Sequence, residues 1–299
     1  PTKPQNENPN KTQQNQQFRL SAPIIKRSHF NLTNTVNASR YDVDPPSCKR
    51  PKVNHVPVSV LPPWAQQCFL GCTKFNNIQS LVFEQAFNGN DNMLVCAPTG
   101  AGKTNVALLT ILQEIRKHIV DKPGLPSLVK SNDNFLIVYI TPMKALATEI
   151  KEKFTNALRH LKINVKEYTG DTRIPAAELE RSHLLVATPE KWDIATRRGG
   201  EDALSNRLKL LIIDEIHLLQ DDRGPVLEAL VSRTLRQVEQ TQSMIRLVGL
   251  SATLPNCQDV GNFLRVPEPN LFIFGPEYRP VPLAMTLIGS KNTQETPQG

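Results

Sequence analysis

The chain has 299 residues, 39% of them hydrophobic, and no apolar run approaches the ~20 residues of a membrane-spanning helix, so we expect no membrane partner. Its formal net charge is +7, but residues 1–60 carry nine Lys or Arg and three Asp or Glu, whereas residues 61–299 carry 26 and 25. Because the first segment supplies nearly all of the positive charge, the basic balance is only weak evidence for a nucleic-acid partner.

Residues 1–60 are rich in Asn, Gln and Pro and show almost no apolar periodicity. Such a composition buries too little apolar surface to offset the entropy of folding, so we expect a disordered basic arm. The basic cluster at residues 49–52 fits a nuclear import signal, although a short basic cluster in a disordered arm is more often ordinary solvated charge. The five cysteines show no zinc-ligand spacing, and we expect reduced thiols in a protein of the nucleus, the cytoplasm or both.

After the arm, the sequence predicts two helices and then strands that alternate with helices. The first two helices are expected at residues 61–69 and 77–87. The predicted strands are continuous apolar runs at residues 93–96, 135–140, 184–187, 208–213, 247–250 and 271–274. The predicted helices between them lie at residues 105–119, 144–161, 189–197, 226–238 and 257–264.

Continuous apolar runs are typical of strands that are buried on both faces. The sequence therefore predicts an α/β fold, a doubly wound parallel sheet flanked by helices, over residues 61–275. In such sheets, ligands bind at the carboxyl ends of the strands. Residues 276–299 lose the alternation, and we expect a linker or the truncated start of a missing second domain.

A glycine-containing turn lies between the first of these strands and the first long helix. This order is typical of a phosphate-binding loop, in which backbone N–H groups and the helix N-terminus bind an anion. In this pattern, Lys103 reaches the terminal phosphates of a nucleotide, and the Thr104 hydroxyl is a ligand of Mg²⁺. The predicted nucleotide-binding residues are Ala97, Pro98, Thr99, Gly100, Ala101, Gly102, Lys103 and Thr104.

Two adjacent carboxylates, Asp214 and Glu215, follow the predicted strand at residues 208–213. In nucleotide hydrolysis, Asp214 would hold Mg²⁺, while Glu215 would orient the attacking water and accept its proton. An acidic pair before a helix is common surface chemistry by itself. Combined with a phosphate loop on another buried strand of the same sheet, it favours nucleoside triphosphate hydrolysis.

Ser251, Ala252 and Thr253 follow another predicted strand. Their small side chains either contact the acidic pair and respond to the nucleotide state, or form a plain turn that caps the next helix. Further strand ends combine hydroxyl groups, helix starts and a lysine, a pattern that favours contacts with a nucleic-acid backbone, although it is also typical of ordinary N-capping. These candidate nucleic-acid-binding residues are Thr141, Pro142, Lys144, Gly170, Thr188 and Pro189.

The ordered set of motifs resembles a superfamily two helicase. It comprises Gln79, residues 97–104, 141–144, 187–190, 214–217 and 251–253. Ala97 replaces the first glycine of the general phosphate-loop pattern, which matches the helicase form. Residues 190–193, 218–228 and 254–256 look like the Ski-like group of large tandem-cassette helicases, and residues 143–147 and 233–246 favour its signal-cointegrator branch over its spliceosomal branch.

The resemblance implies a RecA-like fold, ATP and Mg²⁺ as cofactors, single-stranded RNA or DNA as a partner, 3′ to 5′ movement and membership of a multiprotein complex. Gln79 would read adenine. His217 would join Lys103, Asp214 and Glu215 in the catalytic set, and it would couple hydrolysis to strand movement together with residues 251–253.

Members of this family close their active site between two RecA-like domains, and the second domain contributes arginines. The second domain is not evident in this sequence, so we expect weak hydrolysis from this chain alone, because an arginine finger is worth about 10³- to 10⁵-fold in rate. Two alternatives stay open: a truncated, non-catalytic nucleotide-binding module, and the spliceosomal branch acting on small nuclear RNA duplexes.

Overall fold

The computed structural model describes residues 52–120, 128–129, 135–197, 204–281, 283 and the strands at 25–31, 37–43 and 285–290. The chain divides into two compact units, Lys49–Val281 and a small unit made of Pro1–Cys48 with Pro282–Gly299. None of the described helices is both long and apolar enough to cross a bilayer.

The small unit contains a three-stranded antiparallel sheet in the order β1-β2-β12. Its strands are β1 (Ile25–Asn31), β2 (Asn37–Val43) and β12 (Met285–Ser290). The sequence does not indicate these strands, because β2 pairs with a segment at the other end of the chain and local patterns carry no information on such pairing. The rest of the predicted arm, residues 1–24, 32–36 and 44–51, lies outside the described residues, as do residues 291–299, so arm and linker stay predictions.

The large unit is built on a seven-stranded sheet in which each strand pairs in parallel with its neighbours, in the order β11-β3-β10-β9-β6-β8-β7. The predicted doubly wound α/β fold is thereby confirmed. The strands are β3 (Met93–Cys96), β6 (Leu136–Ile140), β7 (Val165–Tyr168), β8 (Leu184–Ala187), β9 (Leu208–Ile213), β10 (Arg246–Ser251) and β11 (Leu271–Ile273).

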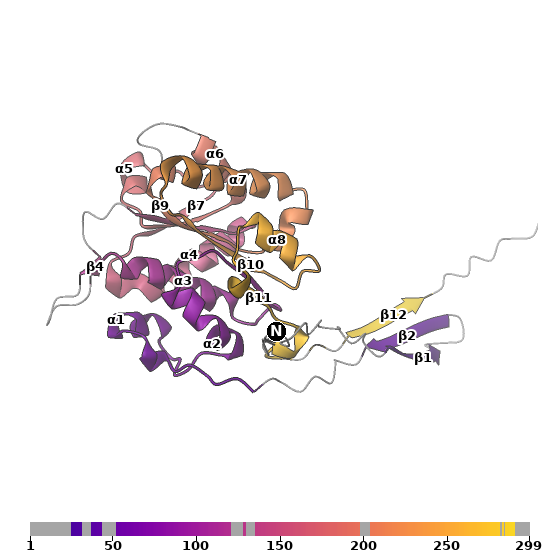
Figure 1. Ribbon diagram of the computed structural model, residues 1–299. Coiled ribbons are helices and arrows are strands. Elements are labelled where there is room, and N and C mark those ends of the chain that lie inside the picture. Colours follow the sequence, from indigo (N-terminus) through magenta and orange to yellow (C-terminus); the bar gives the residue numbers. More distant parts are fainter. Residues whose placement is uncertain are drawn as a thin grey trace, which may run out of the picture. The chain divides into compact units, whose positions relative to one another are not determined.

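Helices cover both faces of this sheet (Figure 1). On one face, α3 (Lys103–Arg116) and α4 (Lys144–Leu158) pack against the strands, α2 (Asn77–Phe83) packs against α3, and α1 (Pro63–Gln66) contributes to the same apolar cluster. The other face packs against α6 (Pro189–Arg197), α7 (Gly224–Thr241) and α8 (Cys257–Phe263). A short helix, α5 (Ala176–Glu180), precedes β8, and a two-stranded ribbon joins β4 (Ile119–Val120) to β5 (Leu128–Val129).

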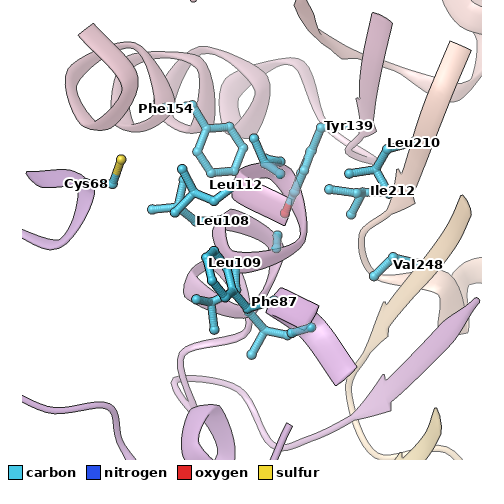
Figure 2. Packing of buried hydrophobic residues seen from close by; sticks show 14 of the residues in the cluster. Cys68, Phe87, Leu108, Leu109, Leu112, Tyr139, Phe154, Leu210, Ile212 and Val248 are labelled. Carbon is cyan, nitrogen blue, oxygen red and sulfur yellow. The ribbon is translucent and has the colours of Figure 1, made fainter. Parts of the chain in front are cut away.

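Successive residues of one strand enter different cores, which explains the continuous apolar runs. In β9, Leu210 and Ile212 join the core beneath α3 and α4, whereas Leu211 and Ile213 join the core beneath α7. Figure 2 shows the first core, where leucines of α3 and a phenylalanine of α4 meet side chains of the central strands. In the described part of the chain, apolar cores therefore cover both faces of the sheet, and the polar motifs lie at its strand ends.

In the large unit, the sequence does not indicate the short ribbon strands β4 and β5, the edge strand β7 or the helix α5. At the edge of the sheet, β7 buries Val165 and leaves its other residues half-exposed, so it lacks the continuous apolar run of a central strand. The five residues of α5 include no buried one, so this helix shows no apolar stripe. The predicted strands agree with the observed ones to within one residue at each end.

Candidate active site and adjoining groove

The strand order brings the sequence motifs to one edge of the sheet. Five neighbouring strands, β3, β10, β9, β6 and β8, each end in a motif at their carboxyl terminus. The hydrogen-bonded ladder continues one residue beyond three of them: Ala97 N donates to Ser251 O at 3.0 Å, Asp214 N to Ile140 O at 2.9 Å and Thr141 N to Ala187 O at 2.9 Å. The sheet therefore fixes the first residue of these motifs directly.

The phosphate loop depends on two glycines with left-handed backbones, Gly100 at φ 78° and Gly102 at φ 87°. A larger residue at position 102 would be strained by this backbone conformation, and its Cβ atom, 2.4 Å from the side-chain nitrogen of Gln79, would displace that amide. Thr99 and Gly100 are exposed at the tip of the loop, and α3 begins at Lys103. The N-terminus of α3 thus faces the loop, as an anion site requires.

The side chain of Gln79 ties α2 to this loop. It forms a capping box with Asn76, in which each side chain accepts a hydrogen bond from the other residue's backbone N–H. The Gln79 Nε2 atom also donates to Gly102 O at 3.2 Å, and Asn76 Nδ2 donates to Ala101 O at 2.9 Å. Gln79 is buried and its amide is engaged with protein groups, so the predicted contact with adenine stays a prediction.

Lys103 is buried and folds back over the loop. Its Nζ atom donates to Ala97 O at 3.0 Å and to Pro98 O at 3.4 Å. Burial lowers the pKa of Lys103, and the charges of Glu215 and Asp214 oppose this shift. The lysine therefore lies within electrostatic reach of both predicted catalytic carboxylates, although they are about 110 residues away in the sequence.

Asp214 is held by two hydrogen bonds. Tyr139 Oη donates to its Oδ2 atom at 2.5 Å, and Glu215 N donates to its Oδ1 atom at 3.0 Å. Burial raises the pKa of Asp214, while the bond from Tyr139 opposes that shift. Tyr139 was not among the predicted site residues; the available signal was a tyrosine within a buried strand, since its hydroxyl group needs a partner there.

Glu215 has a left-handed backbone with φ 53°, a conformation that is uncommon outside glycine and that clusters at functional sites. Its Oε2 atom lies 3.3 Å from Nδ1 of His217. This sharp turn directly after β9 sends the carboxylate and the imidazole to the same edge as Asp214. The structure thus brings together Lys103, Asp214, Glu215 and His217, as the sequence predicts, while their catalytic roles stay predictions.

The donor atoms at this edge fit a magnesium-bound nucleotide. Carboxylate and hydroxyl oxygens, here from Asp214 and the half-buried Thr104, are the ligands that Mg²⁺ prefers. Within the described ranges, Ser251 Oγ is a buried polar atom with no hydrogen-bond partner, as a ligand-facing site would leave it. In the same ranges, no group of three or more His, Cys, Asp or Glu is arranged so that it could hold a metal ion.

The predicted coupling residues differ in burial. Ser251 ends β10 and is buried between the phosphate loop and the acidic pair, since β10 lies between β3 and β9. Ala252 is half-buried and Thr253 is exposed. Ser251 therefore has the position that contact with a nucleotide site requires, and Thr253 faces outward.

A groove of ≈ 570 Å³ lies next to this site, at the ends of β6 and β8. Four predicted nucleic-acid-binding residues line it, while Thr141 and Pro189 are buried beside them. Its described lining residues are Pro142, Met143, Lys144, Ala145, Gly170, Thr188, Glu190, Lys191, Ile194 and Arg223. The two predicted strand-end motifs and Gly170 therefore form one surface.

Charged and apolar side chains alternate in this groove. The Lys144 ammonium lies 2.8 and 2.7 Å from the two carboxylate oxygens of Asp171. Met143 is 56% exposed and Ile194 is 54% exposed. Cations beside exposed apolar side chains match the phosphates and the sugar or base faces of a single strand. Arg223 and Ile194 are not among the predicted binding residues, because no strand-end pattern marks them, and Met143 lies within the 141–144 motif but is not among its predicted contacts.

A family model for the DEAD/DEAH box helicase matches residues 76–260 of the chain, which includes every strand-end motif described above. The chain belongs to the DEAD/DEAH box helicase family. Within this family it is 56% identical over 235 residues to activating signal cointegrator 1 complex subunit 3 of Gallus gallus, an alignment that covers 78% of this chain and 10% of the relative.

The human protein of the same name is 56% identical over 228 residues, covering 76% of this chain and 10% of the relative. The DExH-box ATP-dependent RNA helicase DExH14 of Arabidopsis thaliana is 50% identical over 246 residues, covering 82% and 11%. These likenesses confirm the predicted resemblance to the signal-cointegrator branch. The chain spans about a tenth of the length of these relatives.

Among solved structures, the DUF1998 helicase MrfA bound to DNA has a similar fold. Its TM-score is 0.58 at 20% sequence identity, and the match covers 76% of this chain and 29% of that chain. At this identity the likeness concerns the fold alone, and it agrees with the predicted RecA-like architecture.

Proposed function

We propose that this chain is the first ATP-binding motor domain of an ATP-dependent helicase that moves along single-stranded RNA or DNA. The observation that carries this proposal is the meeting of Lys103 with Asp214 and Glu215 at one edge of the sheet. Family membership supports nucleotide use, and the strand order explains how distant motifs reach a common site.

In the proposed reaction, each residue has a role that suits its position. The Lys103 ammonium exchanges the carbonyl oxygens of Ala97 and Pro98 for the β- and γ-phosphates of ATP. Thr104 and Asp214 hold Mg²⁺, which neutralises charge on the phosphate oxygens when bound. Glu215 orients the attacking water and accepts its proton, and the imidazole of His217 keeps its carboxylate in place.

In the same proposal, the groove beside the nucleotide site binds the sugar-phosphate backbone of one strand. Lys144, Lys191 and Arg223 supply the positive charge, and the helix N-termini at Lys144 and Pro189 supply backbone N–H groups. Phosphate contacts carry no sequence information, so this groove suits a motor that moves along any sequence.

The proposal extends to partners beyond this chain. A second RecA-like domain closes over the nucleotide and supplies arginines, and the whole protein works 3′ to 5′ within a multiprotein complex in the nucleus, the cytoplasm or both. The high identity to a subunit of a signal cointegrator complex supports this view, since a motor domain so similar fits a similar assembly.

Nucleotide binding tests the first part. In a titration with a fluorescent ATP analogue and Mg²⁺, Lys103→Ala should lose about 100-fold or more in affinity, because charge-assisted hydrogen bonds are worth about 1.5–3 kcal/mol each. Lys144→Ala is the matched control, a lysine at the first residue of the next long helix, and should bind normally. Unchanged affinity in the Lys103 variant would refute the proposed site.

Hydrolysis separates the motor from the alternative of a non-catalytic nucleotide-binding module. We expect slow hydrolysis by this chain, and faster, RNA- or DNA-stimulated hydrolysis by a longer chain that includes a second RecA-like domain. A longer chain that binds ATP but shows no stimulation by single strands would favour the non-catalytic module.

A further inference from the structure

Arg223 comes from a different segment of the chain than the other described residues that line the groove. The other lining residues come from the segments that follow β6, β7 and β8. Arg223 alone in that set comes from the segment that follows β9, eight residues after Glu215. One side chain of the nucleotide-site segment therefore reaches into the groove.

The guanidinium of Arg223 contacts both strand-end motifs of the groove. Its Nη1 atom donates to Pro142 O in the loop between β6 and α4. Its Nε atom lies 3.5 Å from Glu190 Oε1 in the first turn of α6. A planar guanidinium presents its donors in a fixed fork, so moving Arg223 would move these two contacts together.

The backbone between Glu215 and Arg223 is a continuous series of tight turns. Leu218 N donates to Glu215 O at 3.0 Å, Asp221 N to Leu218 O at 3.0 Å and Gly224 N to Asp221 O at 2.8 Å. Each bond spans three residues. Leu218 and Asp221 each donate one of these bonds through N–H and accept the next through the carbonyl oxygen, so the turns follow one another without a gap. The backbone of this segment has little conformational freedom, because consecutive hydrogen bonds fix most of its dihedral angles.

Both ends of this segment are anchored. Ile216 is fully buried beneath α7, next to the strained Glu215. At the far end, a Cβ atom on Gly224 would lie 2.2 Å from Leu219 O, so only glycine permits the turn to close against the start of α7. The Arg223 carbonyl then accepts the first bonds of α7, from Val226 N at 3.1 Å and Leu227 N at 3.2 Å.

We propose that Arg223 is the positioning residue through which the nucleotide-site segment sets the spacing of the two strand-end motifs that hold nucleic acid. This inference rests on the proposed function. A shift of Glu215 on nucleotide binding passes along the tight turns to Arg223, and the guanidinium carries it to the Pro142 loop and to α6. The nucleotide state and the affinity for the nucleic-acid strand are thereby linked inside one domain.

The test measures the affinity for fluorescent oligouridylate and oligothymidylate by anisotropy, with and without a non-hydrolysable ATP analogue and Mg²⁺. For the 299-residue chain we expect the nucleotide to change this affinity by about fivefold or more, the usual range for coupled sites. Arg223→Ala should bring the two affinities within about twofold of each other. Arg223→Lys, which keeps the charge but not the fork, should fall between them.

Arg233→Ala is the matched control. Arg233, in α7, also contacts α6, where it lies 3.0 Å from Asp193 Oδ1 and donates to Thr196 Oγ1, but it is not among the described residues that line the groove. If the nucleotide lost its effect on oligonucleotide affinity merely because a side-chain contact with α6 is missing, both alanine variants would show that loss. We expect the Arg233 variant to keep it, with thermal unfolding showing that all variants are folded.

The outcomes separate this inference from the proposed function. A wild-type chain that binds neither oligonucleotide at any nucleotide state would refute the proposed function. Wild-type binding that is insensitive to nucleotide, an Arg223→Ala variant that keeps the wild-type ratio, or equal losses in both alanine variants would each overturn the role of Arg223 and leave the proposed function standing.

Discussion

The nucleotide site and the groove share one edge of the same sheet, yet they are held in different ways. Lys103 and Tyr139 are buried, and each bonds to groups that the sheet itself positions. In the groove, Lys144 and Arg223 are about half exposed and pair with carboxylates on other surface segments, and Arg223 also donates to Pro142 O. One site is therefore built into the core, and the other is assembled from side chains on its surface.

This difference has energetic consequences. Charges in a low-dielectric site interact strongly and resist rearrangement, so the nucleotide site is largely preformed. Exposed ion pairs contribute about 0–1 kcal/mol each, so a phosphate group can replace the carboxylate in the groove at small cost. A motor must bind and release the nucleic-acid strand in each cycle, and weak surface ion pairs suit that task better than buried ion pairs.

The largest expected effect is on the buried side. Glu215→Gln removes the base but keeps the shape, so turnover should fall by about 10²- to 10⁴-fold while ATP affinity stays within about twofold. Single-turnover hydrolysis of labelled ATP, with the chain in excess, measures this. Glu190→Gln makes the same change at an exposed groove residue and should retain most turnover. Similar losses in both variants would erase the contrast between the two regions.

Tyr139→Phe tests whether the core orients the metal ligand. Without the hydroxyl group, Oδ2 of Asp214 loses its donor and the pKa of Asp214 should rise further. We expect ATP to bind about tenfold more weakly in the presence of Mg²⁺, because one hydrogen bond to a charged group is lost. Without Mg²⁺, the change in affinity should be smaller. Tyr278→Phe, in a 3₁₀ turn after β11, is the control. Equal affinities with Mg²⁺ would contradict the prediction.

Asp171→Asn tests the exchangeable pairing in the groove. With Lys144 released from its carboxylate, affinity for oligouridylate at low salt should rise about threefold, as expected for a weak surface pair. The gain should disappear in a Lys144→Ala background. Glu178→Gln removes the partner of Lys166, at 2.8 Å, outside the groove and controls for net charge. A gain that survives without Lys144 would show that only net charge matters.

The smallest expected effect concerns stability. Burial raises the pKa of Asp214, so its charged form is less favourable in the folded chain than in the unfolded chain. The stability that the protonated form retains at low pH is lost as pH rises through the folded pKa. Asp214→Asn should therefore raise the free energy of unfolding at pH 7 by on the order of 1 kcal/mol, a typical gain for a functional-site substitution. The variant should then unfold at a higher urea concentration.

The pH dependence of that gain is the decisive measurement. Below about pH 4, the ordinary range of an aspartate, both folded and unfolded wild-type chains are protonated at this position, so the advantage of Asn should shrink. An advantage that is the same at both pH values would mean that the substitution acts by packing and not by charge.

Much of the molecule follows from the sequence. Continuous apolar runs located the strands of the seven-stranded sheet, apart from the edge strand β7, because the side chains of a strand buried on both faces are apolar on both sides. The phosphate loop, Asp214 and Glu215 were found from local patterns, since a turn that binds phosphate needs glycines and a helix start in a fixed order. Parallel strands then place all such ends at one edge.

Other features were decided by the tertiary structure. Tyr139 meets Asp214, and Arg223 meets Pro142 and Glu190, across distances of 33 to 81 residues in the chain. The order of strands in the sheet and the packing of α6 against α7 create these contacts, and neither is encoded in a local pattern. The sequence therefore determined which chemistry is present, whereas the fold decided which side chains hold it in place, because long-range packing selects neighbours that no short motif can specify.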